Sequence, residues 1–112
     1  MALQNTNPTT TKAWEKLQQH FQTMQTASMK EMFSEDASRA AKFHIKWEDF
    51  LVDYSKNRIN QETINLLLEL ANEVNLKQAI ASYFDGQAIN QTENRAVLHT
   101  ALRSPENNTV IV

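Results

Sequence analysis

The sequence predicts a helix-dominated α+β fold that contains one small β-hairpin. Glycine occurs once and proline twice among the 112 residues, so residues that interrupt helices are scarce. Apolar residues recur at helical spacing over most of the chain, for example from Leu76 to Phe84. One stretch, 44–54, instead combines aromatic and β-branched residues, which is typical of strands.

The composition limits the class of protein. A formal charge of −2 argues against a general nucleic-acid-binding protein, which usually carries a strongly basic face. The absence of cysteine excludes a disulfide framework and a cysteine nucleophile. No apolar run approaches the ~20 residues that cross a membrane, and the N-terminus lacks the order of a secretory signal. We expect a cytoplasmic protein that binds neither nucleic acid nor membrane.

The N-terminal part of the chain begins with an Asn/Thr-rich stretch. We expect residues 1–10 to be a flexible tail and 11–112 to be one helical segment. A first helix is predicted from about Thr11 to Thr23. The apolar residues expected on its inner face are Trp14, Leu17, Phe21 and Met24.

Two short helices and a hairpin are predicted next. Ser28 is a suitable N-cap for a second helix. The segment 35–43 is acidic at its start and basic near its end, as the helix dipole favours, so it predicts a third. The runs 44–47 and 50–54 predict two strands joined by the acidic turn Glu48-Asp49. Because two strands alone are marginally stable, we expect this hairpin to lie against helices.

The longest predicted helix runs from about Gln61 to Val74, with Asn60 as its N-cap. The residues expected in its buried stripe are Ile64, Leu67, Leu68, Ala71 and Val74. Leu66 and Leu70 widen this stripe well beyond the ~100° of an ordinary surface helix, so the helix needs neighbours on more than one side. A further helix, 76–84, is expected to bury its apolar face and to stop at Asp85-Gly86.

A helix over Asn90–Arg103 is the last one that the pattern predicts. Arg95, His99 and Arg103 are four residues apart, and successive members of such a series are offset by roughly 40°, so all three would share one face. A solvated basic surface is the ordinary interpretation of this pattern. The functional alternative is contact with carboxylates of another domain or with an anionic ligand.

The residues that could support catalysis are few. His20, His44 and His99 are widely separated, so no metal site is predicted. A single glycine cannot form a Gly-rich phosphate loop. Ser55-Lys56 could suggest a nucleophile and a base, but a turn between a strand and a helix explains it more simply. No catalytic residue is predicted in this chain.

Several stretches together resemble the N-terminal region of the glucose-6-phosphate isomerase (phosphoglucose isomerase) family. The stretches are Leu51–Ile59, Leu67–Ala71, Phe84–Asn90 and Thr92–Arg103, preceded by Asn7-Pro8-Thr9. The motifs D-Y-S-K-N and T-E-N-R-A-V-L-H are highly specific in combination. The resemblance covers nearly the whole chain.

The resemblance implies reversible interconversion of glucose 6-phosphate and fructose 6-phosphate in glycolysis and gluconeogenesis, by a cytoplasmic homodimer that uses no cofactor. It also implies that the family's glutamate base, its assisting histidine and lysine, and its phosphate loop lie in two α/β sugar-isomerase (SIS) subdomains beyond this chain. The family's N-terminal segment packs on those subdomains as a helical cap. The β-prone run Thr109–Val112 stops at the last residue, which predicts a truncation.

The resemblance gives Arg95, His99 and Arg103 a narrower meaning. We expect these residues to face the SIS subdomains and to support the active site without taking part in the chemistry. The chain alone is expected to act as a scaffold and to be inactive. The alternative is a free-standing small helical module that binds an acidic partner through the same three residues.

Overall fold

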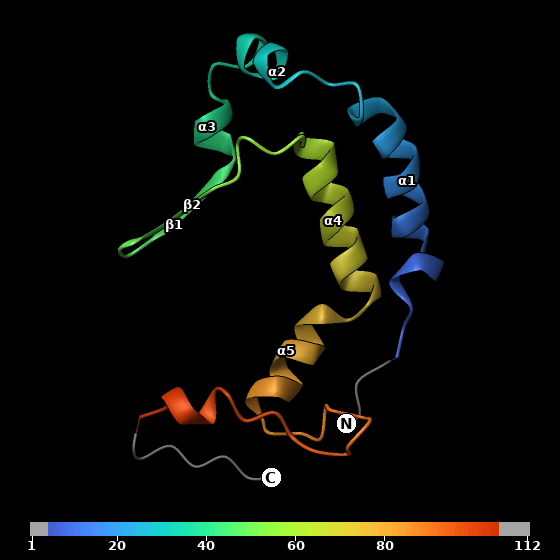
Figure 1. Ribbon diagram of the computed structural model, residues 1–112, viewed down its shortest axis with the longest axis vertical. Helices are drawn as coiled ribbons and strands as arrows, with labels where there is room; N and C mark the ends of the chain where they lie inside the picture. The colour runs from blue at the N-terminus through green and yellow to red at the C-terminus, as the bar shows by residue number, and fades with distance from the viewer. Residues whose placement is uncertain (1–4, 106–112) are drawn as a thin grey trace. The chain divides into compact units, whose positions relative to one another are not determined.

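The computed structural model describes residues 5–105 (Figure 1). The run Thr109–Val112, predicted to be strand-like, lies outside these residues. The described elements, in chain order, are η1 (Pro8–Thr10), α1 (Lys12–Met24), α2 (Met29–Glu35), α3 (Arg39–Lys42), β1 (His44–Trp47), β2 (Phe50–Asp53), α4 (Gln61–Glu73), α5 (Leu76–Phe84) and η2 (Ala101–Arg103). The predicted class, helix-dominated with one hairpin, is confirmed.

The chain forms two compact units, which are described separately. The first unit comprises Lys12–Leu68, and the second comprises Met1–Thr11 together with Glu69–Val112. Within the described part of the chain, the buried apolar side chains are those of Ala13, Met24, Phe43 and Leu66, all in the first unit. The interior of that unit also contains the polar residues His20, Arg39 and Ser55.

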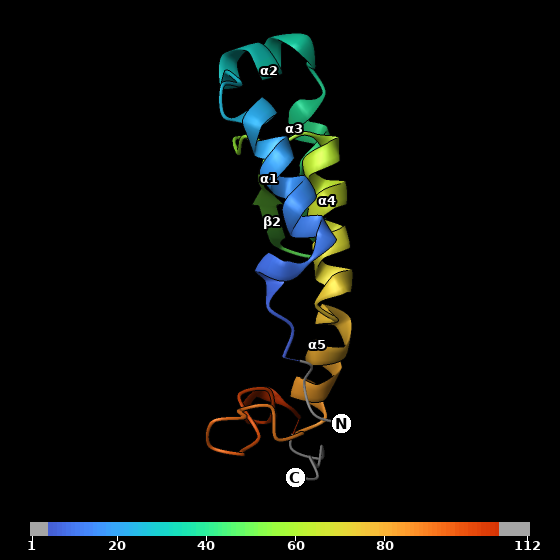
Figure 2. The same ribbon diagram turned by 90° about the vertical axis from the view of Figure 1, so that its right-hand side faces the viewer.

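Helix α1 runs beside the first turns of α4 (Figures 1 and 2). The prediction that Phe21 lies on the inner face of α1 is wrong, because this side chain is 58% exposed. The inner face instead carries Ala13, His20 and Met24. A hydrogen bond between His20 and Thr63 of α4 fixes this rotation of the helix, and the spacing of apolar residues does not reveal such a bond.

The two short helices are set by local polar side chains. Ser28 caps α2 as predicted, its Oγ accepting from the backbone N–H of Glu31 at 3.5 Å. Helix α3 is only one turn long and begins later than predicted. The carboxylate of Asp36 accepts hydrogen bonds from the backbone N–H (3.0 Å) and Oγ (2.6 Å) of Ser38, and this Asx turn competes with helix geometry.

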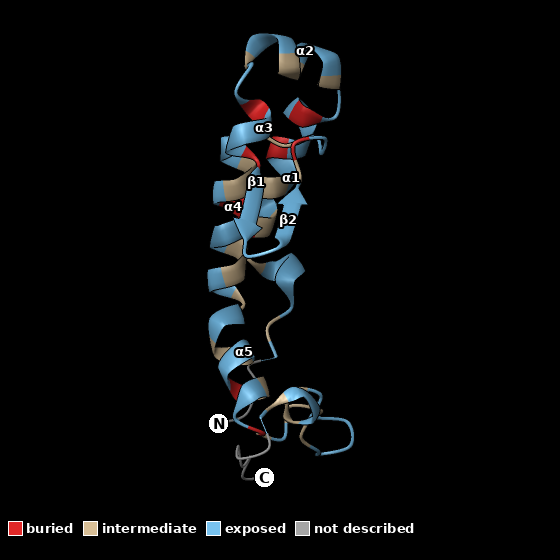
Figure 3. Ribbon diagram, turned by 90° about the vertical axis from the view of Figure 1, so that its left-hand side faces the viewer, coloured by how far each residue is buried: buried red, intermediate tan, exposed pale blue. Residues whose placement is uncertain are grey.

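The predicted hairpin is confirmed, with β1 and β2 paired antiparallel and Trp47 opposite Phe50 beside the turn. The expectation that it lies against helices is wrong, since both strands are exposed along their whole length (Figure 3). The hairpin is attached to the rest of the first unit at its base, the end away from the turn. There the ring of Tyr54 packs edge-on against Phe43 at 5.9 Å between centroids, and the N–H of Tyr54 donates to the carbonyl of Phe43.

Helix α4 begins at the predicted cap. Oδ1 of Asn60 accepts from the backbone N–H of Thr63, and Oγ1 of Thr63 accepts from that of Asn60, both at 3.0 Å. The predicted buried stripe is wrong in detail. Leu66 is the buried residue, at 7% exposed, whereas Leu67 and Leu68 are exposed. The apolar residues surround so much of this helix that their spacing cannot identify the inner face.

Helix α5 has the predicted bounds, and the only glycine ends it. Gly86 has φ of 73°, and the N–H of Gln87 donates to the carbonyl of Ser82 at 3.1 Å, as in a Schellman motif. The predicted burial of its apolar face is wrong, because Ile80 and Phe84 are exposed and Ser82 is its buried residue.

The predicted helix over Asn90–Arg103 is also wrong. Asn90 and Arg95 instead form an isolated antiparallel bridge, with reciprocal N–H···O bonds of 3.0 and 3.2 Å. Asn94 lies in the left-handed region at φ of 54°, and Oδ1 of Asn90 accepts from the N–H of Glu93. Asparagine favours such turns, and a left-handed residue interrupts helical hydrogen bonding. Only Ala101–Arg103 is helical, as one 3₁₀ turn.

Candidate functional site

The most densely bonded side chain among the buried residues is that of Arg39, on α3. It is 3% exposed. Its guanidinium donates three hydrogen bonds to backbone carbonyls of one loop: Nε to Ser55 (2.8 Å), Nη2 to Asn57 (2.6 Å) and Nη1 to Ile59 (2.8 Å). We refer to residues 54–59 as the Arg39 loop. The guanidinium therefore contacts every second residue of this loop.

Two aromatic rings lie close to the same guanidinium. Its Cζ atom lies 4.8 Å from the ring centroid of Phe43 and 5.6 Å from that of Phe33. Within residues 5–105, Arg39 forms no ion pair, so carbonyl dipoles and ring faces surround the buried charge. In the sequence, Arg39 is recognisable only as a basic residue of a short helix, and no motif indicates this arrangement.

The beginning of the Arg39 loop is tied to the end of β2. Oδ1 of Asp53 accepts from the backbone N–H of Ser55 at 2.9 Å. Hydrogen bonds from the side chain and backbone of Ser55 lower the pKa of Asp53 from its usual range. Ser55 is 1% exposed, so it cannot reach a substrate as a nucleophile. The simpler explanation of Ser55-Lys56, a turn between strand and helix, describes this segment.

A second polar contact joins α1 to α4. Nε2 of the buried His20 lies 2.6 Å from Oγ1 of Thr63, and its Nδ1 lies 3.5 Å from a carboxylate oxygen of Glu62. The ring nitrogens of His20 thus contact two residues of the first turn of α4, and which nitrogen donates depends on the tautomer of the ring. The sequence did not single out this pair, because the two residues lie 43 positions apart.

The three predicted interface residues do not share a helical face. Arg95 lies beside Glu93, with 3.8 Å between Nη1 and Oε2. Arg103 donates from Nη1 to the carbonyl of His99 at 3.1 Å. All three residues are exposed. His99 lies next to Arg103. The predicted basic stripe required a helix over residues 90–103, and this helix is absent. The alternative of an acidic partner depended on that stripe.

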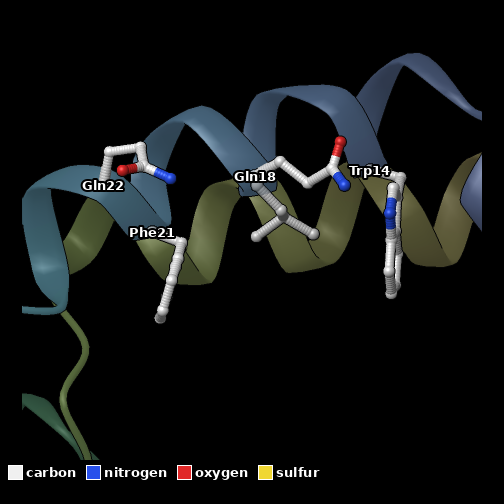
Figure 4. Close-up of a pocket in the computed structure, with 5 residues that line it drawn as sticks. Trp14, Gln18, Phe21 and Gln22 are labelled. Atoms are coloured by element: carbon white, nitrogen blue, oxygen red, sulfur yellow. The ribbon is translucent and has the colours of Figure 1, made fainter.

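Two apolar surfaces of the first unit are open. One is a hollow of about 500 Å³ on α1, lined by Trp14, Leu17, Gln18, Phe21 and Gln22. The side chains of Trp14 and Phe21 project from the helix in the same direction (Figure 4). The other is one face of the hairpin, where Trp47 stacks on Phe50 with ring centroids 5.3 Å apart. By the strand register, Ile45 and Val52 lie on that same face.

Comparison with known proteins identifies the family. A family model described as phosphoglucose isomerase matches residues 53–112, which is more than half of the chain. The chain belongs to the phosphoglucose isomerase family. The match begins at Asp53, immediately before the Arg39 loop, and continues through α4 and α5.

A curated relative agrees with this assignment. The glucose-6-phosphate isomerase of Christiangramia forsetii is 61% identical over 102 residues, which cover 91% of this chain. They cover 19% of the relative, so the chain spans less than a quarter of that protein's length. Within residues 5–105, none of the helices combines the length and apolar character needed to cross a membrane. The family predicted from the sequence is confirmed.

Proposed function

We propose that this chain is the N-terminal part of a glucose-6-phosphate isomerase, which reversibly interconverts glucose 6-phosphate and fructose 6-phosphate. The observation that carries the proposal is the 61% identity to the Christiangramia forsetii isomerase. The chain corresponds to 19% of that enzyme, and within it the chain acts as a scaffold that supplies packing surface rather than catalytic groups.

The exposed apolar side chains support a packing role. Leu68 on α4 is 60% exposed, and Ile80 and Phe84 on α5 are also largely exposed. Complete burial of such a side chain stabilises a protein by about 1.5–3 kcal/mol relative to full exposure. Covering several half-exposed residues at once therefore provides a strong driving force for docking. The surface that covers them is the remainder of the isomerase chain, with its SIS subdomains.

The same proposal includes Arg95, His99 and Arg103 as residues that face the SIS subdomains. Their exposure supports it, since each side chain is available to a further partner. The nearby Glu93 does not prevent this, because an exposed ion pair is worth at most about 1 kcal/mol. The three residues support the active site through contacts and take no part in proton transfer.

The family also suggests the setting of the reaction. We place the enzyme in the cytoplasm, in glycolysis and gluconeogenesis, as a homodimer that uses no metal or organic cofactor. Sugar phosphate is its substrate.

A chimera tests the proposal. The matching segment of the Christiangramia forsetii isomerase is replaced with this chain, and glucose 6-phosphate formed from fructose 6-phosphate is measured with a coupling dehydrogenase. We expect the chimera to turn over substrate at a rate close to that of the relative. The relative without this segment, and the 112-residue chain alone, should be inactive.

The matched control inserts the same residues in scrambled order. A chimera that folds and associates like the parent enzyme but shows no turnover contradicts the proposal. Turnover by the purified 112-residue chain contradicts the scaffold role.

A further inference from the structure

We propose that Arg39 is a positioning residue: its guanidinium sets the conformation of the Arg39 loop and so fixes the point at which α4 begins. The proposal goes beyond the isomerase assignment and does not depend on it, because its test measures no catalytic activity. Arg39 lies outside the 53–112 range that the family model matches, whereas the loop that it contacts lies inside that range.

The geometry of the three hydrogen bonds is specific to arginine. Nε, Nη1 and Nη2 point in fixed directions in one plane, and each meets a different carbonyl of the loop at 2.6–2.8 Å. A lysine ammonium is a single compact donor centre on a flexible stem and cannot reproduce this planar fork. The three contacts therefore require the carbonyls of Ser55, Asn57 and Ile59 to turn toward one side.

The surroundings of Arg39 indicate a role in geometry rather than in general stability. A buried charge loses its hydration, and within residues 5–105 no carboxylate compensates for this loss at Arg39. An apolar side chain between Phe33 and Phe43 would fill similar space without that loss. What an apolar residue cannot supply is donors for three carbonyls that point inward.

The loop transmits this constraint to the rest of the first unit. While its carbonyls face Arg39, the side chains of Lys56 and Arg58 are exposed. The next residue, Asn60, caps α4 through Thr63, and Thr63 in turn bonds to His20 of α1. Hydrogen bonds thus connect the buried side chain of Arg39 on α3 to the loop, the start of α4 and helix α1 in turn.

Trypsin provides a test at the loop itself, because it cleaves after Lys56 and Arg58. Cleavage of the 112-residue chain is followed by mass spectrometry for wild type, Arg39→Ala, Arg39→Lys and the control Leu66→Ala. Protease cleavage requires local opening, so its rate at each bond reports the order of that segment. Bonds after Lys16 and Lys30, outside the loop, report general unfolding.

We expect both Arg39 variants to speed cleavage after Lys56 and Arg58 by roughly tenfold or more, with much smaller changes after Lys16 and Lys30. Leu66→Ala should raise all four rates together, because it weakens the apolar interior without touching the loop. Added methylguanidinium should restore protection of the loop bonds in Arg39→Ala, whereas ammonium should not.

Four results would overturn the proposal. The first is a cleavage rate that rises equally at all four bonds in Arg39→Ala, and the second is loop cleavage in Arg39→Lys that is as slow as in wild type. The third is that methylguanidinium at non-denaturing concentration does not slow loop cleavage in Arg39→Ala. The fourth is that the loop of the wild-type chain is cleaved as fast in buffer as in urea. The lysine variant keeps the charge, so it separates the geometry of the fork from its charge even where the alanine variant unfolds.

Discussion

Nε2 of His20 lies 2.6 Å from Oγ1 of Thr63, so a buried side chain of α1 bonds directly to the residue that closes the first turn of α4. Thr63 already makes three hydrogen bonds with Asn60 at this helix start: its N–H and its hydroxyl donate to Oδ1 of Asn60, and Oγ1 accepts from the N–H of Asn60. The contact between α1 and α4 and the cap of α4 therefore share one hydroxyl group.

Replacing that hydroxyl should weaken both interactions. Thr63→Val keeps the shape of the side chain but removes the donor and acceptor, and we expect the free energy of unfolding to fall by about 1–2 kcal/mol. Urea denaturation followed by circular dichroism measures the change. Thr92→Val, at an exposed position, is the control. A double-mutant cycle with His20→Ala that returns no coupling energy would argue against a shared network.

The carboxyl group of Asp36 should titrate at unusually low pH. Hydrogen bonds from the side chain of Lys42 and from the side chain and backbone of Ser38 lower its pKa from 3.8 to about 2. Because the folded state favours the carboxylate, this contribution to stability is fully present above pH 3.8 and is lost as the pH falls through about 2.

Carbon-13 NMR of the Asp36 carboxyl group measures this pKa directly. We expect Lys42→Met to raise the titration midpoint, since it removes the largest cause of the shift. The urea-unfolded chain is the reference and should titrate near 3.8. A midpoint that stays the same in the Lys42 variant would assign the shift to Ser38 alone.

The turn of the hairpin should become more stable when glycine replaces Glu48. Glu48 has φ of 47°, and a residue with a Cβ atom in the left-handed region costs about 1–2 kcal/mol. Glycine is preferred at the first position of a two-residue type II′ turn. We expect Glu48→Gly to slow amide exchange in β1 and β2 by roughly three- to fivefold. Asp49→Gly, at a position without positive φ, should bring no gain.

The open apolar surfaces should make the isolated chain self-associate or bind a hydrophobic dye. We expect the double variant Trp47→Thr and Phe50→Thr to reduce dye fluorescence, because it removes the stacked pair from the hairpin face. Lys46→Gln, on the opposite face, should leave the signal unchanged. A chain that sediments as a monomer and binds no dye would contradict this prediction.

Elements with local start and stop signals could be predicted from the sequence. Ser28 and Asn60 cap their helices with their own side chains, and Gly86 supplies the left-handed residue that ends α5. These signals lie within a few residues of the element they define. The prediction of a helix over Asn90–Arg103 was wrong because it overlooked another local signal. The turn formed by Asn90 and Asn94 outweighs the apolar spacing that follows.

Inner faces and buried polar contacts could not be predicted. Leu66 is buried and Leu68 is exposed, although both belong to one nearly continuous apolar surface of α4. Arg39 bonds to carbonyls 16–20 residues away, and backbone acceptors have no signature in the sequence. The interface role of Arg95, His99 and Arg103 stays a prediction, now for residues on an irregular segment rather than on a helix.

The polar interior of the first unit has a thermodynamic consequence. Heat capacity rises on unfolding mainly because apolar surface becomes hydrated, whereas exposing polar groups lowers it. The buried apolar residues of this unit are only Ala13, Met24, Phe43 and Leu66, and three polar residues are buried with them: His20, Arg39 and Ser55. The unit therefore exposes little additional apolar surface when it unfolds. Its stability should therefore change with temperature along an unusually flat curve, and calorimetry should record a small heat-capacity step for its number of residues.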